Sequence, residues 1–438
     1  MNLSSITIEN FRCFEKLTVD LDSRMNVIAG NNGAGKSSIL EAISIGIGSF
    51  LLGIDEAVAP GIDKSDVRFV SYEVGSVIDR QPQFPCKIKC DGIVDNNKIT
   101  WSRQLNTESG KTTYGDAFLI KNIASSLQNT IREGNNKVNL PIISYYGTGR
   151  LWAQKREKAI SSEMKHRNRF SGYVDCLSSM SNEKLMIKWF NKMTMQQLQD
   201  GDIIPELATV EEAVARCFEG SGIVANDIKV RFNIKSNELE ITYIDHDGKK
   251  IKQPFHELSD GYKNTLSLVA DIAYRMAVLN PQLLSDVIRK TSGIIIIDEI
   301  DLHLHPKWQK NILKTLTSIF PKIQFIVSTH SPSVISSATE NQLMVLNEGH
   351  ITRFDKIYGK DINSVLIEIM DVKSRPDDVE KKLNSFYEYL DTENYSKAKE
   401  ILDELSELLG ENNNDVVKAN VAYDFESFEG INSNDKNK

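Results

Sequence analysis

The segment Gly30–Ser37 constrains the fold of this chain more than any other part of its 438 residues. It reads GNNGAGKS, matches the pattern G-x-x-x-x-G-K-S/T, and lies between a predicted strand, Asn26–Ala29, and an apolar-rich helix pattern, Ser38–Phe50. Glycines let backbone N–H groups close around phosphate oxygens that a Cβ would keep out, and a helix N-terminus adds partial positive charge. The order of strand, loop and helix predicts a phosphate-binding loop in an α/β fold rather than an accidental glycine-rich turn.

Two side chains of this loop have roles that follow from their chemistry. We expect Lys36 to reach the β- and γ-phosphates of a nucleotide and the Ser37 hydroxyl to ligate Mg²⁺. The other expected nucleotide contacts come from the loop and its border, at Asn31, Asn32, Gly33, Ala34, Gly35 and Ser38.

A second motif supplies the acidic groups that such a loop needs. Gly293 precedes four consecutive isoleucines, Ile294–Ile297, a pattern typical of a strand buried on both faces, and Asp298 and Glu299 follow directly. We expect Asp298 to enter the magnesium shell and Glu299 to orient and deprotonate the attacking water. A strand end with two solvated acids is the alternative, and the phosphate-binding loop in the same chain argues against it.

A third segment indicates a second anion site. The residues LSDGY, Leu258–Tyr262, open a long predicted helix that continues to Leu279. A hydroxyl, a glycine backbone and a helix N-terminus come together there. The expected contacts are Ser259, Asp260 and Gly261.

In this order the segments resemble the ABC-type ATPases, whose signature LSGGQ reads LSDGY here and differs at the third and fifth positions. In that family the signature closes on the nucleotide of the other protomer, so the resemblance implies a homodimer or higher oligomer around ATP and Mg²⁺. Ile300–Pro306 lies where the family has its D-loop, which implies a nucleotide contact for Asp301. His330 follows the apolar strand Ile323–Ser328 as the family's switch histidine does, although a lone histidine can also be structural.

Two segments resemble the SMC/RecF/OLD branch of these ATPases. Ile8–Phe14 is similar to the start of that branch, and Asp298–Pro306 is similar to the D-E-x-x-x-H-L-H-P form of OLD-like ATPases. The branch implies that Arg12 contacts nucleotide, with a structural salt bridge as the alternative. Tyr145–Arg150 lies at a plausible position for the family's Q-loop but contains no glutamine. His303 and His305 are expected to pack in the D-loop rather than to bind metal.

A finer resemblance is to the PtuA-type ATPases of Septu and retron anti-phage systems, and it is carried by Tyr145–Trp152, Gly359–Asn363 and a short helical end. Those ATPases pair with a separate HNH nuclease, which implies a nuclease subunit docked on residues 377–430 and leaves DNA as a possible partner. The 88 residues after His350 contain no Asp-x-Asp strand for a nuclease domain of their own. A RecF-like DNA repair ATPase and a nucleotide-sensing scaffold with negligible turnover are the alternatives.

The expected fold class is α/β, a P-loop ABC-type ATPase with a mixed sheet, an antiparallel β lobe, a helical insertion and a C-terminal helical hairpin. Asp377–Leu390 and Ser396–Leu409 carry apolar residues at helical spacing and predict the hairpin. The expected divisions are the N-terminal ATPase lobe with its β subdomain at 1–150, the helical insertion at 151–225, the C-terminal ATPase lobe at 226–353, the hairpin at 354–411, and an acidic flexible tail at 412–438.

Charge and cysteine content bound the remaining functions. The net charge is −8, and residues 371–438 alone hold 17 acidic and 9 basic residues, which suits a basic protein partner better than DNA. A basic run at residues 150–169 is either a DNA contact or a solvated helical face. The 5 cysteines show neither metal spacing nor a disulfide framework, and the chain lacks the roughly 20-residue apolar run of a membrane span. We therefore expect a cytoplasmic protein that does not bind a membrane.

Overall fold

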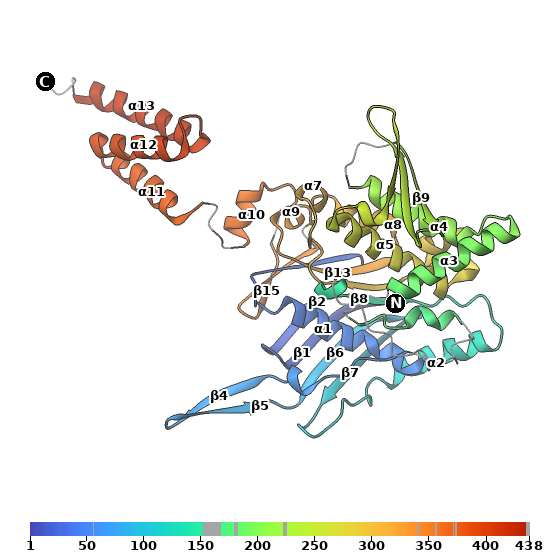
Figure 1. The fold of residues 1–438 in the computed structure, drawn as a ribbon. Coiled ribbons are helices and arrows are strands. Elements are labelled where there is room, and N and C mark those ends of the chain that lie inside the picture. The colour runs from blue at the N-terminus through green and yellow to red at the C-terminus, as the bar shows by residue number, and fades with distance from the viewer. Residues whose placement is uncertain are drawn as a thin grey trace. The chain divides into compact units, whose positions relative to one another are not determined.

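A computed structural model gives the arrangement of the chain (Figure 1). Two compact units are present, Met1–Ile362 and Asn363–Lys438, and each is described by itself. The residues that the structure describes are 1–55, 57–151, 168–178, 183–221, 226–339, 341–354, 357–370, 372 and 375–434.

A six-stranded sheet forms the centre of the first unit, in the order β15-β14-β3-β13-β12-β8. Its strands are β3 (Met25–Ala29), β8 (Ile142–Tyr146), β12 (Gly293–Ile297), β13 (Ile323–Thr329), β14 (Leu343–Asn347) and β15 (His350–Thr352). All are parallel except β15, and the central strands are buried along their whole length. The expected mixed sheet is confirmed. Because parallel strands end at one edge, the segments after β3, β12 and β13 meet there.

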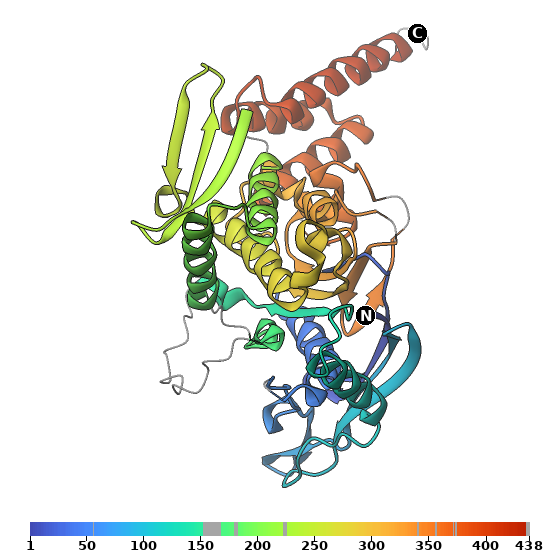
Figure 2. The same cartoon turned by 90° about the vertical axis from the view of Figure 1, so that its right-hand side faces the viewer.

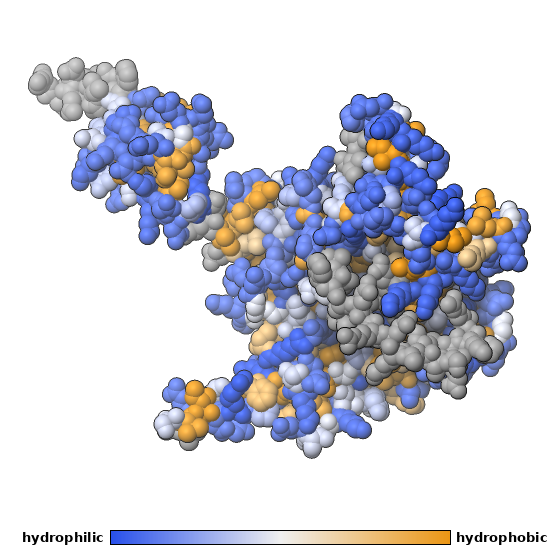
Figure 3. Space-filling view, in the orientation of Figure 1, coloured by the Kyte–Doolittle hydropathy of each residue, from blue (hydrophilic) through white to orange (hydrophobic). Residues whose placement is uncertain are grey.

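A four-stranded antiparallel sheet, in the order β2-β1-β6-β7, is the expected β lobe. Its strands are β1 (Asn2–Phe11), β2 (Phe14–Asp20), β6 (Cys86–Val94) and β7 (Asn97–Leu105). Asp95 and Asn96 take positive φ angles, 47° and 62°, as a tight hairpin turn requires. A separate hairpin, β4 (Phe69–Val74) and β5 (Val77–Pro82), projects from the unit and exposes apolar side chains such as Val77 and Ile78 (Figures 1 and 3).

Helices cover both faces of the central sheet (Figure 2). Helix α1 (Lys36–Ile47) lies between this sheet and the antiparallel lobe, while α5 (Asp260–Leu279) packs on the opposite face. The stretch Lys36–Gly53 is long and apolar enough to cross a membrane by composition alone, but 78% of it is buried in the fold, as in a core helix. The other helices of this unit are α2 (Phe118–Arg132), α3 (Glu183–Asp200), α4 (Pro205–Glu219), α6 (Val287–Lys290), α7 (Pro306–Gln309), α8 (Ile312–Ile319) and α9 (Pro332–Ile335), and α10 (Ile362–Glu368) begins at its last residue.

The expected helical insertion contains α3 and α4, although residues 152–167 and 179–182 lie outside the described part of the chain. A three-stranded sheet of β9 (Asn226–Asn233), β10 (Glu238–Ile244) and β11 (Lys250–Pro254) packs on α4. Most of the basic run at 150–169 falls within the residues not described, so its role stays a prediction. The boundaries at 150, 225 and 353 also stay predictions.

The second unit contains α10 except for its first residue, and a helical bundle formed by α11 (Asp377–Asp391), α12 (Tyr395–Leu409) and α13 (Asn414–Asn434). The predicted hairpin of α11 and α12 is confirmed. The expectation of a flexible tail at 412–438 is wrong for α13, because Val416 and Ala419 are buried in the core that α11 and α12 share. Arg375 fixes the start of this helix through two hydrogen bonds to Asp415, at 2.8 and 2.7 Å. The prediction of a flexible tail rested on the polar composition of this segment and overlooked its short apolar face, in which Val416 and Ala419 lie three residues apart.

Candidate nucleotide site

The loop Gly30–Ser37 joins the end of β3 to the start of α1, as predicted. Gly33 and Gly35 have φ angles of +80° and +105°, which L side chains rarely adopt, and a Cβ on Gly35 would lie 2.7 Å from Cys13 Sγ. Helix α1 has neither a side-chain cap nor an acidic residue in its first turn. Its N-terminal N–H groups and partial positive charge therefore fit an anion such as phosphate.

Lys36 is buried, and its ammonium group turns back over the loop. Nζ donates to the carbonyl oxygens of Gly30 (2.9 Å) and Asn31 (3.1 Å) and lies 2.7 Å from Nε2 of His330. Burial lowers the pKa of Lys36, and the negative charges of Asp298, Glu299 and Asp301 oppose that shift. The ammonium group of Lys36 therefore lies close enough to these three carboxylates to feel their charge. A cation and several carboxylates in one place fit a site for phosphate and a divalent metal ion.

His330 lies directly after β13 and faces the phosphate-binding loop. Burial and then the charge of Lys36 lower its pKa, which favours the neutral imidazole at neutral pH. A neutral ring can accept from Lys36 through Nε2 and donate through Nδ1. The structure thus brings His330 next to the lysine of the phosphate-binding loop, and its contact with the terminal phosphate stays a prediction.

The residues after β12 form a network with the end of β13. Ser328 Oγ donates to Asp298 Oδ1 (2.5 Å) and accepts from the backbone N–H of Glu299 (2.8 Å). Thr329 Oγ1 donates to Asp301 Oδ1 (2.6 Å). Glu299 takes a positive φ of 48°, an uncommon conformation for a non-glycine residue that is frequent at functional sites.

Carboxylate and hydroxyl oxygens are the ligands that Mg²⁺ prefers. Asp298 supplies the first beside the buried ammonium of Lys36, and Ser37 supplies an exposed hydroxyl at the start of α1. Each of these two side chains has the chemistry of a magnesium ligand, and the shared metal site stays a prediction.

The signature segment begins α5, with Ser259 at the N-cap position and without a side-chain capping hydrogen bond. Ser259 and Asp260 are exposed, whereas Gly261 is buried against the D-loop of the same chain. A Cβ on Gly261 would lie 2.3 Å from the carbonyl oxygen of His303, so the close approach requires glycine. The structure leaves the Ser259 side of this segment open to a second molecule.

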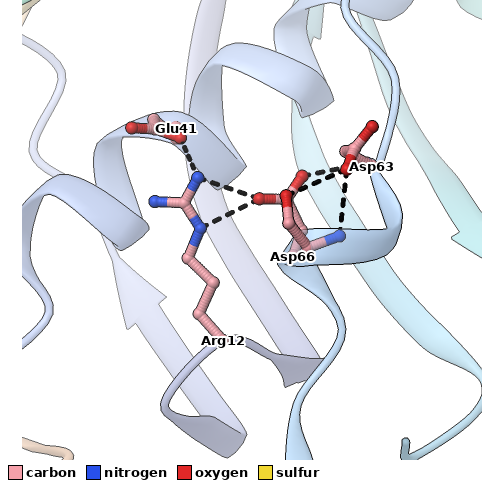
Figure 4. Close-up of polar contacts among 5 residues, drawn as sticks. Arg12, Glu41, Asp63 and Asp66 are labelled. Carbon is pink, nitrogen blue, oxygen red and sulfur yellow. Dashed lines mark hydrogen bonds and ion pairs between the residues drawn. The ribbon is translucent and has the colours of Figure 1, made fainter.

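Arg12 holds an ion-paired position rather than an open one (Figure 4). Its Nη2 pairs with Glu41 of α1 and, at 2.8 Å, with Asp66, and Nε donates to Asp66 at 2.9 Å. Hydrogen bonds to these carboxylates raise the pKa of Arg12 although burial, the largest single effect, lowers it. Of the two alternatives for Arg12, the structure therefore shows the salt bridge. This salt bridge attaches α1, the helix that follows the phosphate-binding loop, to the segment that contains Asp66.

Several polar residues of this site are not among those predicted from the sequence. Ser328 and Thr329 connect the end of β13 to Asp298 and Asp301, and Ser331 donates to Gln309 of α7. Their proximity to His330 in the sequence was the signal that could have identified them. In the segment considered for the Q-loop, Tyr146 donates to Asp271 of α5 (2.7 Å), which also pairs with Arg275. His305 Nδ1 accepts from the backbone N–H of Lys307 and caps α7, as expected of D-loop packing.

Comparisons with known proteins find ATPases among the relatives of this chain. A family profile described as an AAA domain matches residues 5–220. The Retron Vc95 probable ATPase of Vibrio cholerae is 26% identical over 80% of this chain and 74% of its own length, and the Retron Ec83 probable ATPase of Escherichia coli is 26% identical over 90% and 81%. The chain is therefore related to these probable ATPases, and the matches support the predicted ABC-type ATPase of the SMC/RecF branch.

Within this group of ATPases the chain is related to those of anti-phage systems. The Septu protein PtuA of Bacillus thuringiensis is 34% identical over a shorter match, 32% of this chain and 35% of the relative. The predicted resemblance to the retron and Septu ATPases is confirmed.

Proposed function

We propose that this ABC-type ATPase binds Mg-ATP at the carboxyl edge of its central sheet, hydrolyses it as a homodimer or higher oligomer, and thereby controls a separate nuclease. The observation that carries the proposal is the convergence of Lys36, Asp298 and His330 after β3, β12 and β13. Nucleotide chemistry needs a phosphate cradle, a metal ligand and a group for the terminal phosphate, and these three elements supply them.

Each side chain of the site has a proposed task. Ser37 and Asp298 would hold Mg²⁺, which would screen the phosphate charge. Glu299 orients water and accepts its proton, and His330 donates a hydrogen bond to the γ-phosphate. The remaining proposed nucleotide contacts are Asn31, Asn32, Gly33, Ala34, Gly35, Lys36, Ser38 and Asp301, whereas Arg12 is held in its salt bridge to Glu41 and Asp66.

The second half of each site comes from the other protomer. Ser259, Asp260 and Gly261 stand at the N-terminus of α5, and the first two are exposed although they lie in an otherwise buried helix. A hydroxyl and a helix N-terminus attract phosphate without a side-chain cation. Two molecules that each offer a phosphate-binding loop and this segment can therefore enclose two ATP molecules.

The partner docks on the C-terminal unit, within residues 377–430. Helix α13 exposes Val417, Val421 and Phe425, which are 46%, 65% and 63% accessible and recur every fourth residue on one face. At 3.6 residues per turn, Asp424 lies at one edge of that face and Lys418 at the other. An exposed apolar stripe on a helix fits a hydrophobic groove, as helix-in-groove recognition requires. The relatives named for Septu and retron systems support a nuclease of anti-phage defence, in the cytoplasm, as the partner.

The substitution Glu299→Gln tests the catalytic assignment. It keeps the volume and hydrogen-bonding capacity of the side chain but removes the base, so we expect ATP to stay bound while turnover falls by about 100-fold or more. Glu348→Gln is the matched control, because Glu348 also takes a positive φ but lies in the turn between β14 and β15. Unchanged hydrolysis by Glu299→Gln would remove the assigned base.

The same variants separate hydrolysis from sensing. If ATP binding alone controlled the nuclease, Lys36→Ala would change nuclease activity and Glu299→Gln would leave it as in the wild type. Our proposal expects both substitutions to change it. The measurement is DNA cleavage by the co-expressed nuclease subunit with each ATPase variant.

A further inference from the structure

The short helix α7, Pro306–Gln309, lies where three parts of the candidate site meet. Its last residue, Gln309, uses both ends of its side-chain amide. Nε2 donates to the carbonyl oxygen of Leu304 in the D-loop (2.9 Å), and Oε1 accepts from Ser331 Oγ (2.7 Å). Ser331 directly follows His330, so one side chain spans the D-loop and the switch loop.

A second link between these loops lies on the other side of His330. Thr329 Oγ1 donates to Asp301 of the D-loop (2.6 Å) and accepts from the backbone N–H of Ser331 (3.0 Å). Both neighbours of His330 in the chain are therefore hydrogen-bonded to this region: Thr329 to Asp301, and Ser331 to Gln309 of α7. Two attachment points leave the backbone of the histidine little freedom to shift relative to the D-loop.

The same helix also holds the signature segment. The ring of Trp308, next to Gln309, packs on Tyr262 with centroids 4.7 Å apart, and Tyr262 packs in turn on Phe218 of α4 at 5.6 Å. Tyr262 stands at the fifth position of the signature and is packed in its own protomer. Gly261 approaches the His303 carbonyl as well, and Asn264 donates to the carbonyl oxygen of Leu302 (3.3 Å), so three contacts join the start of α5 to the D-loop region.

We propose that Gln309 is a positioning residue that fixes His330 relative to the D-loop and, through the adjacent Trp308–Tyr262 contact, couples the switch histidine to the signature of the same protomer. The inference rests on the proposed function, in which that signature completes the nucleotide site of the second protomer. A shift of His330 at one nucleotide site then moves the group that serves the other site. Neither residue of the amide bridge touches nucleotide in this account.

Steady-state ATP hydrolysis by full-length variants tests the proposal. Gln309→Met removes both hydrogen bonds at nearly constant volume, and we expect kcat to fall about tenfold, KM to stay within about twofold, and any cooperativity in ATP to disappear. Ser331→Ala should reproduce this, Ser331→Thr should restore activity because it keeps the hydroxyl, and the double variant Gln309→Met with Ser331→Ala should be no slower than either single variant.

Gln282→Met is the matched control. Gln282 also bridges two acceptors through its amide, Val138 O and Asn139 Oδ1 (both 2.9 Å), but it lies before β12 at the amino end of the sheet. We expect its kcat and cooperativity to match those of the wild type. A role of Gln309 confined to stability would lower the melting temperature of Gln309→Met without changing kcat.

The outcomes separate the two hypotheses. If the wild type hydrolyses ATP and Gln309→Met retains wild-type kcat and cooperativity, the inference is overturned and the proposed function stands. Additive losses in the double variant, or a loss of the same size in Gln282→Met, also overturn the inference. If the wild type does not hydrolyse ATP, the proposed function and the inference fail together.

Discussion

Nζ of Lys36 lies 2.7 Å from Nε2 of His330, although 294 positions separate the two residues in the chain. The contact joins the helix after β3 to the loop after β13, the neighbouring parallel strand. The two side chains that we propose as phosphate contacts therefore meet because their strands, β3 and β13, are parallel neighbours in the sheet. The same contact gives the site a specific dependence on pH.

The stability of the wild type relative to His330→Gln should fall as the pH drops below about 6.5, the ordinary pKa of histidine. Burial and Lys36 lower the pKa of His330, while Asp301, Glu299 and Asp298 oppose the shift. The unfolded chain then binds the proton first, so the stabilising effect of the neutral ring is present above pH 6.5 and is lost as the pH falls through the folded-state pKa. Urea denaturation of both proteins between pH 5 and pH 8 measures the difference. If the free energies of unfolding of the two proteins differed by the same amount at every pH in that range, this prediction would be wrong.

Gly261→Ala should destabilise the protein and stop turnover. The added Cβ would lie 2.3 Å from the backbone carbonyl oxygen of His303, which cannot move as a side chain can. We expect the free energy of unfolding to fall by about 1–3 kcal/mol, as for other overpacked sites. The control is Gly115→Ala, because nothing lies within 4 Å of the Cβ position there and its φ is not positive. Equal melting temperatures for the two variants would show that the signature does not pack on the D-loop.

Val416→Asp should unfold the C-terminal bundle while Val417→Asp should not. Val416 is completely buried in the core that α13 shares with α11 and α12, whereas its neighbour is 46% exposed. An isolated charge in that core costs about 3 kcal/mol or more. Amide hydrogen exchange of residues 414–427 in both variants measures the effect. Fast exchange of these amides in the wild type would mean that α13 is not part of the bundle.

The sequence predicted the elements that carry the strongest local patterns. The loop Gly30–Ser37, the isoleucine strand before Asp298 and the helix after Ser259 are all present, because buried parallel strands and glycine-rich loops leave few alternative conformations. Helix α2 was not predicted, since its buried face is narrow and includes the polar residue Gln128.

The connections between elements could not be predicted. Gln309 and Ser331 carry ordinary polar side chains, and only the meeting of α7 with the loop after β13 gives them a common role. The sequence predicted either a nucleotide contact or a salt bridge for Arg12. The salt bridge forms with Asp66, which is 54 positions away in the chain and could not be identified as its partner from the sequence. Such pairings are set by the packing of distant segments, which local spacing does not specify.

The most direct test of the account is to mix two inactive variants. Lys36→Ala destroys the phosphate-binding loop, and Ser259→Arg blocks the signature, so each homodimer has two defective sites. A heterodimer of the two contains one site with an intact loop from one protomer and an intact signature from the other. We predict that the mixture regains ATP hydrolysis, to about half the wild-type rate per heterodimer if the two sites act independently. A mixture that forms heterodimers but stays inactive, or a Ser259→Arg protein that is fully active alone, would contradict the shared site.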